Sequence, residues 1–259
     1  MNSRLFQRDF TIMILGQIIS LFGNAILRFS LSLYVLEVTG SAAVFGTILA
    51  VSMIPTVLLS PFGGVLADRL PKQKIMTILD FVTAGLIVFY DAVYGSAGNL
   101  AAVTIFMILL TLIQAFYQPS VQASIPLLAS QEQLMAANGI VMQVQALAGL
   151  LGPILAGMLY GIGGVKPILA ASAVCFFLSA VMELFLRIPH EKREADGSPV
   201  RMALLDLKGA VTYLIRENTC LFKLLIVVAG INLFLSALFI IGLPYLVKIY
   251  LGMSAQAYG

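Results

Sequence analysis

Long runs of apolar residues without charge constrain this chain more than any other feature. A membrane-spanning helix needs roughly 20 such residues, because every backbone amide must find its hydrogen-bond partner inside the segment. Hydrophobic residues make up 60% and charged residues 10% of the 259 residues, whereas soluble domains carry about 25% charged residues. The chain is therefore predicted to lie in a lipid bilayer.

Seven runs are long enough to span the bilayer as helices. The predicted spans are Phe10–Leu36, Ala42–Leu66, Ile75–Tyr94, Leu100–Gln122, Ala137–Gly161, Pro167–Leu186 and Leu224–Val247. They lack the alternating pattern of about 10 residues that is typical of an outer-membrane β-strand. The predicted fold class is an all-α integral membrane protein.

Basic residues are unevenly distributed over the connections between these spans. Twelve of the fifteen lie before the first span, after the second, or between the sixth and the seventh: Arg4, Arg8, Arg69, Lys72, Lys74, Arg187, Lys192, Arg193, Arg201, Lys208, Arg216 and Lys223. Lys166 and Lys248 lie in the opposite connections, and Arg28 lies inside a span. Because short cytoplasmic loops retain positive charge, we predict a multi-pass protein of the cell (plasma or inner) membrane with a cytoplasmic N-terminus.

The reactive residues do not form the pattern of an enzyme, a metal site or a nucleotide site. His190 is the only histidine and has no nucleophile or metal-ligand partner at a known spacing. Cys175 and Cys220 are interpreted as packing thiols. No glycine loop with its lysine is present to hold ATP, so we expect no cofactor and an ion gradient as the energy source. The net charge of +3 suits loops near anionic lipid and does not indicate a nucleic-acid partner.

A polar stretch divides the chain into three predicted parts. Residues 1–187 form a six-helix bundle, residues 188–219 a cytoplasmic linker, and residues 220–259 the first span of a further bundle. Within the linker, apolar residues recur at helical spacing from Arg201 to Ile215, which predicts an amphipathic helix at the membrane surface. A six-span bundle, a basic surface helix and the start of another bundle are the layout expected of a two-bundle transporter.

The connection after the second span carries a recognisable motif. Its residues are Gly64, Asp68, Arg69, Lys72 and Lys74. The pattern resembles the loop signature of the major facilitator superfamily. The segments NAILRFSLSLYVLEVTGS, YQPSVQASIPLL and AANG are similar to its drug-efflux branch, which includes macrolide and siderophore exporters. The resemblance implies twelve spans in two bundles, so we expect this chain to be an N-terminal half with a seventh span and a missing C-terminal bundle.

The same five residues are predicted to act as a conformational latch. A glycine lets one helix end approach its neighbour closely. Asp68 can pair with the following cations or with helix ends in one conformation and separate from them in the other. The alternative is that Arg69, Lys72 and Lys74 only anchor the hairpin on the cytoplasmic side.

Small residues recur in the fifth predicted span. Gly149, Pro153, Gly157 and Gly161 are spaced by four residues, and Gly152 adds a further small site. This spacing predicts a smooth stripe against which another helix can pack at close range. In the resembled family such a stripe is associated with exporters that exchange substrate against protons. Generic helix packing is the alternative.

Polar residues inside spans are costly in hydrocarbon and are therefore candidates for a substrate or proton path. In the first span, Gln17, Ser20, Asn24 and Arg28 share one helix face. Arg28 either faces inward toward an acidic or anionic group or extends to the outer interface.

The third and fourth spans provide further candidates. Asp80 is the best-placed acid, because Asp91 and Glu183 lie near the ends of their spans. It is either a proton carrier or a charge at the start of a helix. Gln114 and Gln118, followed by Gln122, recur every four residues and can hydrogen-bond substrate or a neighbouring span.

The expected function is export of amphiphilic small molecules, such as macrolides, by proton antiport through alternating access. The expected partners are the substrate, protons and membrane lipid. Two alternatives stay open: a siderophore or other small-molecule exporter or importer of the same fold, and a membrane interaction module that does not transport.

Overall fold

The computed structural model describes residues 7–95, 99–189, 205, 208–209 and 212–252. Six long helices form a bundle: α1 Arg8–Thr39, α2 Ala42–Arg69, α3 Lys72–Tyr94, α4 Leu100–Leu128, α5 Leu134–Gly163 and α6 Val165–Leu184. A 3₁₀ turn, Gln131–Gln133, precedes α5, and a π-helical turn, Tyr213–Glu217, precedes α8, which spans Thr219–Ala237. Helical turns continue α8 at Leu238–Gly242 and Tyr245–Tyr250.

The predicted all-α membrane fold is confirmed. Seven helices are long and apolar enough to cross a membrane, and the described residues contain no strand. Most helices extend past the predicted apolar spans, whereas α6 ends at Leu184, two residues before the predicted end. Capping residues mark several of the helix ends. α1 ends at Gly40, whose φ of 59° is left-handed, a conformation that glycine adopts without steric cost. Ser41 and Asn99 accept backbone N–H groups in the first turns of α2 and α4.

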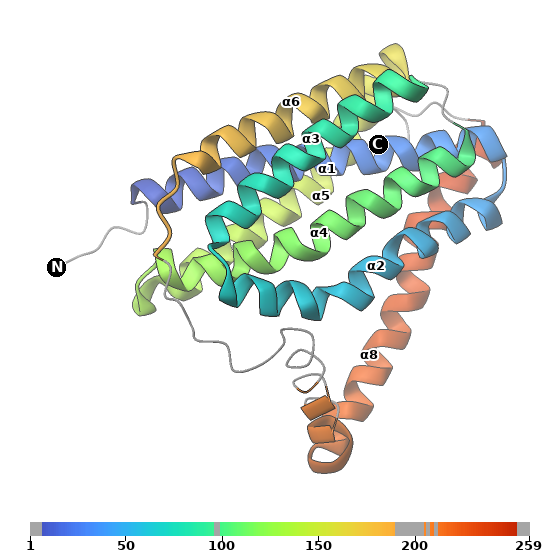
Figure 1. Ribbon diagram of the computed structural model, residues 1–259. Helices are drawn as coiled ribbons and strands as arrows, with labels where there is room; N and C mark the ends of the chain where they lie inside the picture. The colour runs from blue at the N-terminus through green and yellow to red at the C-terminus, as the bar shows by residue number, and fades with distance from the viewer. Residues whose placement is uncertain (1–6, 96–98, 190–204, 206–207, 210–211, 253–259) are drawn as a thin grey trace.

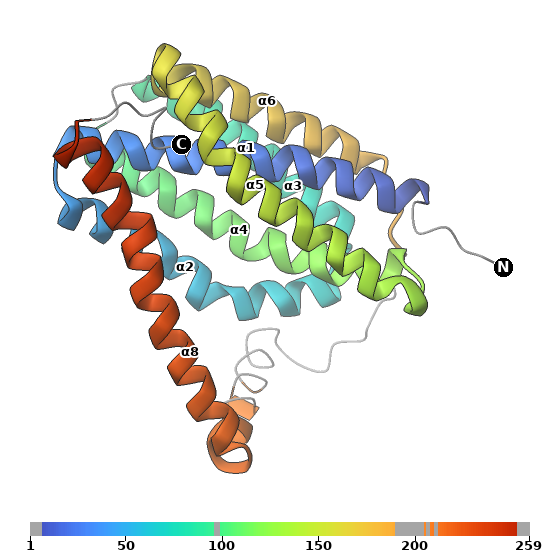
Figure 2. The ribbon, with the colours of Figure 1, turned by 180° about the vertical axis from the view of Figure 1, so that it is seen from behind.

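Helix α1 is central to the bundle and contacts α2, α4, α5 and α6. α2 packs mainly on α4, and α3 packs mainly on α6 and α4. Figures 1 and 2 show α6 and α2 on opposite sides of the bundle. The order of packing brings helices that are distant in sequence, such as α1 and α6, side by side.

Small residues and serines let α1 and α6 approach closely. The Ser172 hydroxyl donates to the Gly23 carbonyl and the Ser179 hydroxyl to the Gly16 carbonyl, both at 3.0 Å. A Cβ on Gly23 would lie 2.8 Å from the Cys175 Cβ. Lipid supplies no hydrophobic driving force between helices, so such close backbone contacts and interhelical hydrogen bonds hold them together.

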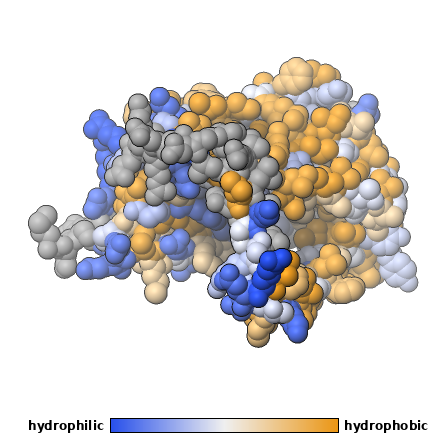
Figure 3. Space-filling view, turned by 60° about the horizontal axis from the view of Figure 1, so that its bottom comes forward, coloured by the Kyte–Doolittle hydropathy of each residue, from blue (hydrophilic) through white to orange (hydrophobic). Residues whose placement is uncertain are grey.

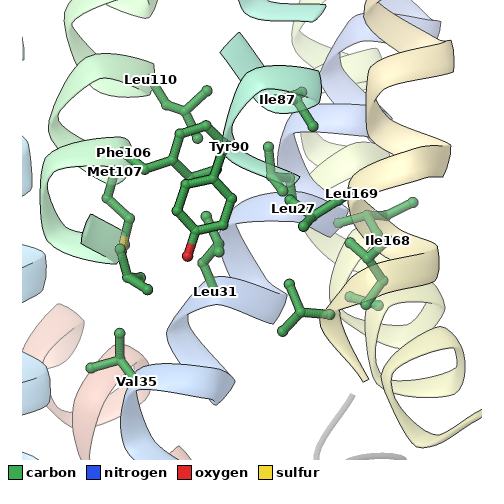
Figure 4. Close-up of a cluster of buried hydrophobic side chains, with 14 of the residues drawn as sticks. Leu27, Leu31, Val35, Ile87, Tyr90, Phe106, Met107, Leu110, Ile168 and Leu169 are labelled. Carbon is green, nitrogen blue, oxygen red and sulfur yellow. The ribbon is translucent and has the colours of Figure 1, made fainter. Parts of the chain in front are cut away.

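Two clusters of buried apolar side chains occupy the two ends of the bundle. The larger one gathers residues such as Leu27, Ile87 and Leu169, and includes Tyr90 stacked on Phe106 with ring centroids 4.3 Å apart (Figure 4). The smaller cluster lies toward the start of α1. Its members include Phe10, Met13, Met76, Val121 and Leu186.

Between the clusters lies a set of buried polar side chains, which we call the polar layer. It consists of Gln17 and Ser20 on α1, Thr77 and Asp80 on α3, Tyr117 on α4, and Ser179 and Glu183 on α6. Along α1, the layer falls between Ile14 of the smaller cluster and Ile26 of the larger one. Along α6, it falls between Phe176 and Leu186 in the same way. The bundle therefore contains a polar section at one level.

Helix α8 stands apart from the bundle. None of its residues is buried, and Figure 1 shows its first turns well away from the other helices. Contact is made by the turn Leu238–Gly242, which packs on α2. Figure 3 shows hydrophobic side chains over a broad area of the surface, with hydrophilic ones at the left of the view and on the part that projects at the bottom. Most of the predicted amphipathic helix, from Arg201 to Ile215, lies outside the described residues.

Candidate functional site

The five residues of the predicted latch lie at the facing ends of α2 and α3. Gly64, Asp68 and Arg69 belong to the last turns of α2, and Lys72 and Lys74 to the first turn of α3. The side chains of Asp68 and Lys74 are exposed. The structure thus gathers the motif at one short hairpin, while its role in a conformational change stays a prediction.

The close helix approach near this hairpin involves Gly63, whereas the sequence interpretation assigned it to Gly64. A Cβ on Gly63 would overlap the Ala115 carbonyl oxygen of α4, but nothing lies within 4 Å of a Cβ on Gly64. Neighbouring residues on a helix point about 100° apart, since one turn takes 3.6 residues. Gly63 therefore faces α4 and Gly64 faces away from it.

The small-residue stripe of α5 meets different surroundings along its length. Gly152 is buried, and a Cβ there would lie 2.5 Å from the Ala25 Cβ of α1. Gly157 is also buried and Gly161 is exposed. Nothing lies within 4 Å of a Cβ on Gly149. Among these stripe glycines, the closest contact is thus made at Gly152, which directly precedes Pro153 and does not belong to the series spaced by four residues.

Gly149 and Pro153 line a pocket between α1, α2, α5 and α8. The pocket has a volume of about 450 Å³. Arg28 and Ser32 contribute from α1, and Ser236 contributes from α8. The remaining lining is apolar, with residues such as Ala25, Phe29, Leu49, Met53, Leu233 and Ile240, and it includes no carboxylate. The arrangement suits an amphiphile whose polar group lies near the guanidinium.

The predicted polar face of α1 is divided between two environments. Gln17 and Ser20 are buried in the polar layer, 0% and 2% exposed. The Asn24 side-chain oxygen is buried without a hydrogen-bond partner. Only Arg28 lines the pocket. The four residues therefore do not form one continuous lining.

Two of the predicted glutamines of α4 join a hydrogen-bonded row. The Gln118 amide donates to the Gln114 side-chain oxygen at 3.5 Å, and the Gln145 amide of α5 donates to the Gln118 side-chain oxygen at 3.4 Å. These bonds are long, so their contribution to stability is small. Gln122 is exposed. The row links α4 to α5 beside the polar layer.

Asp80 is buried, 1% exposed, and belongs to a network that crosses four helices. The Tyr117 hydroxyl of α4 donates to the Glu183 carboxyl oxygen Oε1 at 2.8 Å. The Ser20 hydroxyl of α1 donates to the Tyr117 oxygen at 3.4 Å. The Ser179 hydroxyl of α6 lies beside the Asp80 carboxyl and donates to the Gly16 carbonyl of α1. The network connects α1, α3, α4 and α6 at the level of the polar layer.

Glu183 and Tyr117 are the members of this network that the sequence interpretation did not select. Glu183 was set aside because it lies near the end of its span, yet its side chain is 0% exposed. Tyr117 was not selected, and its side chain is also 0% exposed. Glu183 follows Ser179 by four residues, so both share a helix face, and this spacing was the available signal.

The described residues contain no group of three or more His, Cys, Asp or Glu side chains that could hold a metal ion. Both cysteines are free thiols: Cys175 is half-buried and Cys220 is exposed.

Comparison with known proteins adds to this geometry. The sequence model of the Major Facilitator Superfamily matches residues 13–259. Macrolide efflux protein A of Streptococcus pyogenes is 29% identical over 217 residues, which cover 82% of this chain and 52% of that protein. Macrolide efflux protein A of Enterococcus faecalis is 28% identical, with 73% of this chain and 58% of that protein covered.

A further relative is the Staphyloferrin A transporter of Staphylococcus aureus. It is 23% identical over 179 residues, which cover 68% of this chain and 45% of that protein. The chain thus spans about half the length of the relatives it matches.

Proposed function

The chain belongs to the Major Facilitator Superfamily, and from this premise we propose that it exports amphiphilic small molecules, macrolides among them, by alternating access. It is a multi-pass membrane protein with seven apolar helices. Two of its relatives are named as macrolide efflux proteins. Because the chain spans about half of their length, activity and substrate are proposed for the complete gene product.

The observation that carries this proposal is the pocket between α1, α2, α5 and α8. Its lining is mostly apolar, with a few polar groups, which is typical of sites that bind drug-sized ligands. It lies between the six-helix bundle and α8, where movement of one part against the other would open or close it. The stripe residues Gly149 and Pro153 form one of its walls.

A siderophore or another anionic amphiphile is a second candidate substrate. Arg28 is the charged residue of the pocket lining, and no carboxylate lies opposite it. A guanidinium binds carboxylate groups well because its donors match their geometry. The relationship to a Staphyloferrin A transporter is consistent with this candidate.

Proton antiport is the proposed energy source. The sequence offers no nucleotide loop, and the bundle buries carboxyl groups, which are residues that carry protons in transporters.

The hairpin of α2 and α3 is the proposed latch. We expect Asp68→Asn to lower efflux at equal protein abundance, because the latch loses the negative charge of Asp68. Glu132→Gln, an exposed carboxyl outside the hairpin, is the control and should leave efflux unchanged.

Export is tested by macrolide accumulation in cells that express the complete gene. Gly149→Leu adds a side chain to the pocket without steric conflict, since nothing lies within 4 Å of its Cβ. We expect it to lower efflux severalfold. Gly139→Leu on the same helix is equally free of contacts but lies outside the pocket, and should transport normally. Equal efflux from both variants, or no efflux from the unaltered protein, contradicts the proposal.

A cytoplasmic N-terminus is proposed from the distribution of basic residues. This orientation puts the start of α8, with the exposed Cys220, on the cytoplasmic side. A membrane-impermeant maleimide should label Cys220 in inverted vesicles and not in intact cells. Labelling in intact cells would reverse the orientation.

A further inference from the structure

Asp80 and Glu183 are buried together in the polar layer. Their side chains are 1% and 0% exposed. They lie close enough to interact electrostatically, although they belong to α3 and α6. One oxygen of each carboxyl, Oδ2 of Asp80 and Oε2 of Glu183, is buried without a hydrogen-bond partner among the described residues. Burying such groups is costly, so the pair requires an explanation that packing does not provide.

The groups around the pair carry no positive charge. The partners of the two carboxyls in the described helices are Ser179, Tyr117 and each other. From α1, Ser20 reaches Tyr117. The pair is therefore not the acidic half of an ion pair in the described part of the bundle.

The hydroxyl groups around the pair already use their hydrogens elsewhere. Ser20 donates its hydrogen to Tyr117, Tyr117 donates to Glu183 Oε1, and Ser179 donates to the Gly16 carbonyl. Each hydroxyl has a single hydrogen, so these groups leave Asp80 Oδ2 and Glu183 Oε2 unpaired among the described residues. The hydrogen bond from Tyr117 favours the ionised form of Glu183, so a single proton on the pair is assigned to Asp80.

A second, independent observation comes from Gln17. Its side chain is 0% exposed, and both its amide nitrogen and its amide oxygen lack a partner among the described residues. It lies on α1 between Gly16, which packs against Ser179 and Glu183, and Ser20. Its amide can both donate and accept, so the polar layer contains unused hydrogen-bonding capacity besides that of the two carboxyls.

The electrostatic repulsion between the two carboxyls also favours binding of a proton. Two ionised carboxylates side by side in a low-dielectric interior repel each other, and each loses its hydration. One proton removes one of the two charges and turns an acceptor into a donor. No metal-binding group of His, Cys, Asp and Glu is present in the described residues, so a proton is the ligand that these residues fit.

We propose that Asp80 and Glu183 form a proton-binding site that holds one exchangeable proton, with Tyr117 as the residue that positions Glu183. Loading takes one proton from water and forms one O–H bond on a carboxyl oxygen; unloading reverses this step. No other bond changes and no electron moves. The assignment of this proton as the coupling proton rests on the proposed function.

The site is connected to the hairpin of α2 and α3 through Gln73. Its side-chain amide donates to the backbone carbonyls of Glu183 at 3.1 Å and of Leu184 at 3.3 Å. Gln73 lies between Lys72 and Lys74 of the proposed latch. Loss of the proton leaves two like charges on α3 and α6, and their repulsion acts on the helix end to which Gln73 is bonded. Proton release can thus alter the hairpin.

Infrared spectroscopy tests the site without transport. The chain in lipid at neutral pH should show the absorption of a protonated carboxylic acid, which Asp80→Asn removes. Tyr117→Phe and Glu183→Gln should shift this absorption, because each changes one neighbour of the acid. Glu132→Gln, an exposed carboxyl, should leave it unchanged.

Three results would overturn the site: no such absorption in the unaltered chain, its survival in Asp80→Asn, or its loss when sodium replaces potassium, which would identify a metal ion. If Asp80→Asn does not fold, Tyr117→Phe and Glu183→Gln decide whether the absorption comes from this pair. An absorption that neither of them moves does not come from this pair.

Transport by the complete gene product in proteoliposomes tests the coupling role. Coupling between two ligands typically changes affinity by about 5- to 150-fold, so Asp80→Asn should lower pH-gradient-driven substrate accumulation by about tenfold or more. Substrate exchange without a gradient should persist within about twofold, since it needs no net proton movement. A gradient response that survives in Asp80→Asn overturns the site alone. No gradient response in the unaltered protein overturns the coupling role and proton antiport together.

Discussion

Single glycines determine where the helices of this bundle touch. Gly63 directly precedes Gly64, the first residue of the motif, yet only Gly63 meets the backbone of α4. The packing residue therefore lies next to the motif and not within it. Backbone atoms cannot move aside as a flexible side chain can, so the cost of a substitution is expected to differ sharply between the two positions.

We expect Gly63→Ala to destabilise the protein and Gly64→Ala to leave it unchanged or slightly stabilised. Overpacking a helix contact costs about 1–3 kcal/mol. Alanine in an exposed helix position gains about 1 kcal/mol over glycine. Thermal unfolding in detergent measures the difference. Equal melting temperatures for the two variants would contradict the close contact between α2 and α4.

Arg28 is expected to set the charge preference of the pocket. Hydrogen bonds to charged groups contribute about 1.5–3 kcal/mol, so Arg28→Gln should weaken binding of an anionic amphiphile by about tenfold or more. Binding of a cationic amphiphile should improve, because no carboxylate lines the pocket to offset the guanidinium. Equilibrium binding of two dyes of opposite charge measures both effects. Parallel changes for both dyes would indicate a structural role.

At the scale of whole helices, most of what apolar patterning predicts is present. Each predicted span corresponds to a helix. The starts of α2 and α4, Ala42 and Leu100, are as predicted. Other ends differ because a helix continues past its apolar run: α1 continues from the predicted Leu36 to Thr39, before Gly40, and α4 from the predicted Gln122 to Leu128. The sequence did not show which side of each helix faces its neighbours, because an apolar span in lipid has no polar side that marks its orientation. For this reason, the close contact at Gly152 could not be distinguished from the rest of the predicted stripe.

The contact between α1 and α5 can be tested by exchanging the side-chain sizes of the two facing residues, Gly152 and Ala25. A Cβ on Gly152 would lie 2.5 Å from the Ala25 Cβ, so Gly152→Ala should destabilise the bundle by about 1–3 kcal/mol. Ala25→Gly removes the opposing methyl group and should restore most of the loss in the double variant. The melting temperatures of the single and double variants give the coupling energy. Additive losses would mean that the two residues do not touch.

At the scale of the molecule, the bundle and α8 differ in what they bury. The six helices bury two apolar clusters and a polar layer, whereas α8 buries none of its side chains. The three parts that the sequence predicts from the polar stretch before the seventh span stay a prediction. The pairing of α1 with α6 could not be predicted, because apolar spans do not show which helices become neighbours in the bundle. The polar network depends on this pairing.

Because α8 contributes no buried side chain, its removal should leave the bundle intact. We expect deletion of residues 212–252 to destabilise the six-helix bundle in detergent by about 0.5–3 kcal/mol, the size of a single substitution, because this segment contacts the bundle through Ile241, which packs on the larger cluster, and the buried Pro244. Binding of an amphiphilic dye should fall, since Leu233, Ser236 and Ile240 form one wall of the pocket. The infrared absorption assigned to Asp80 should persist, because the polar layer contains no residue of α8. A large loss of stability would mean that α8 packs on the bundle more closely than the structure has it. Loss of dye binding with an unchanged carboxyl absorption would separate the substrate pocket from the proton site.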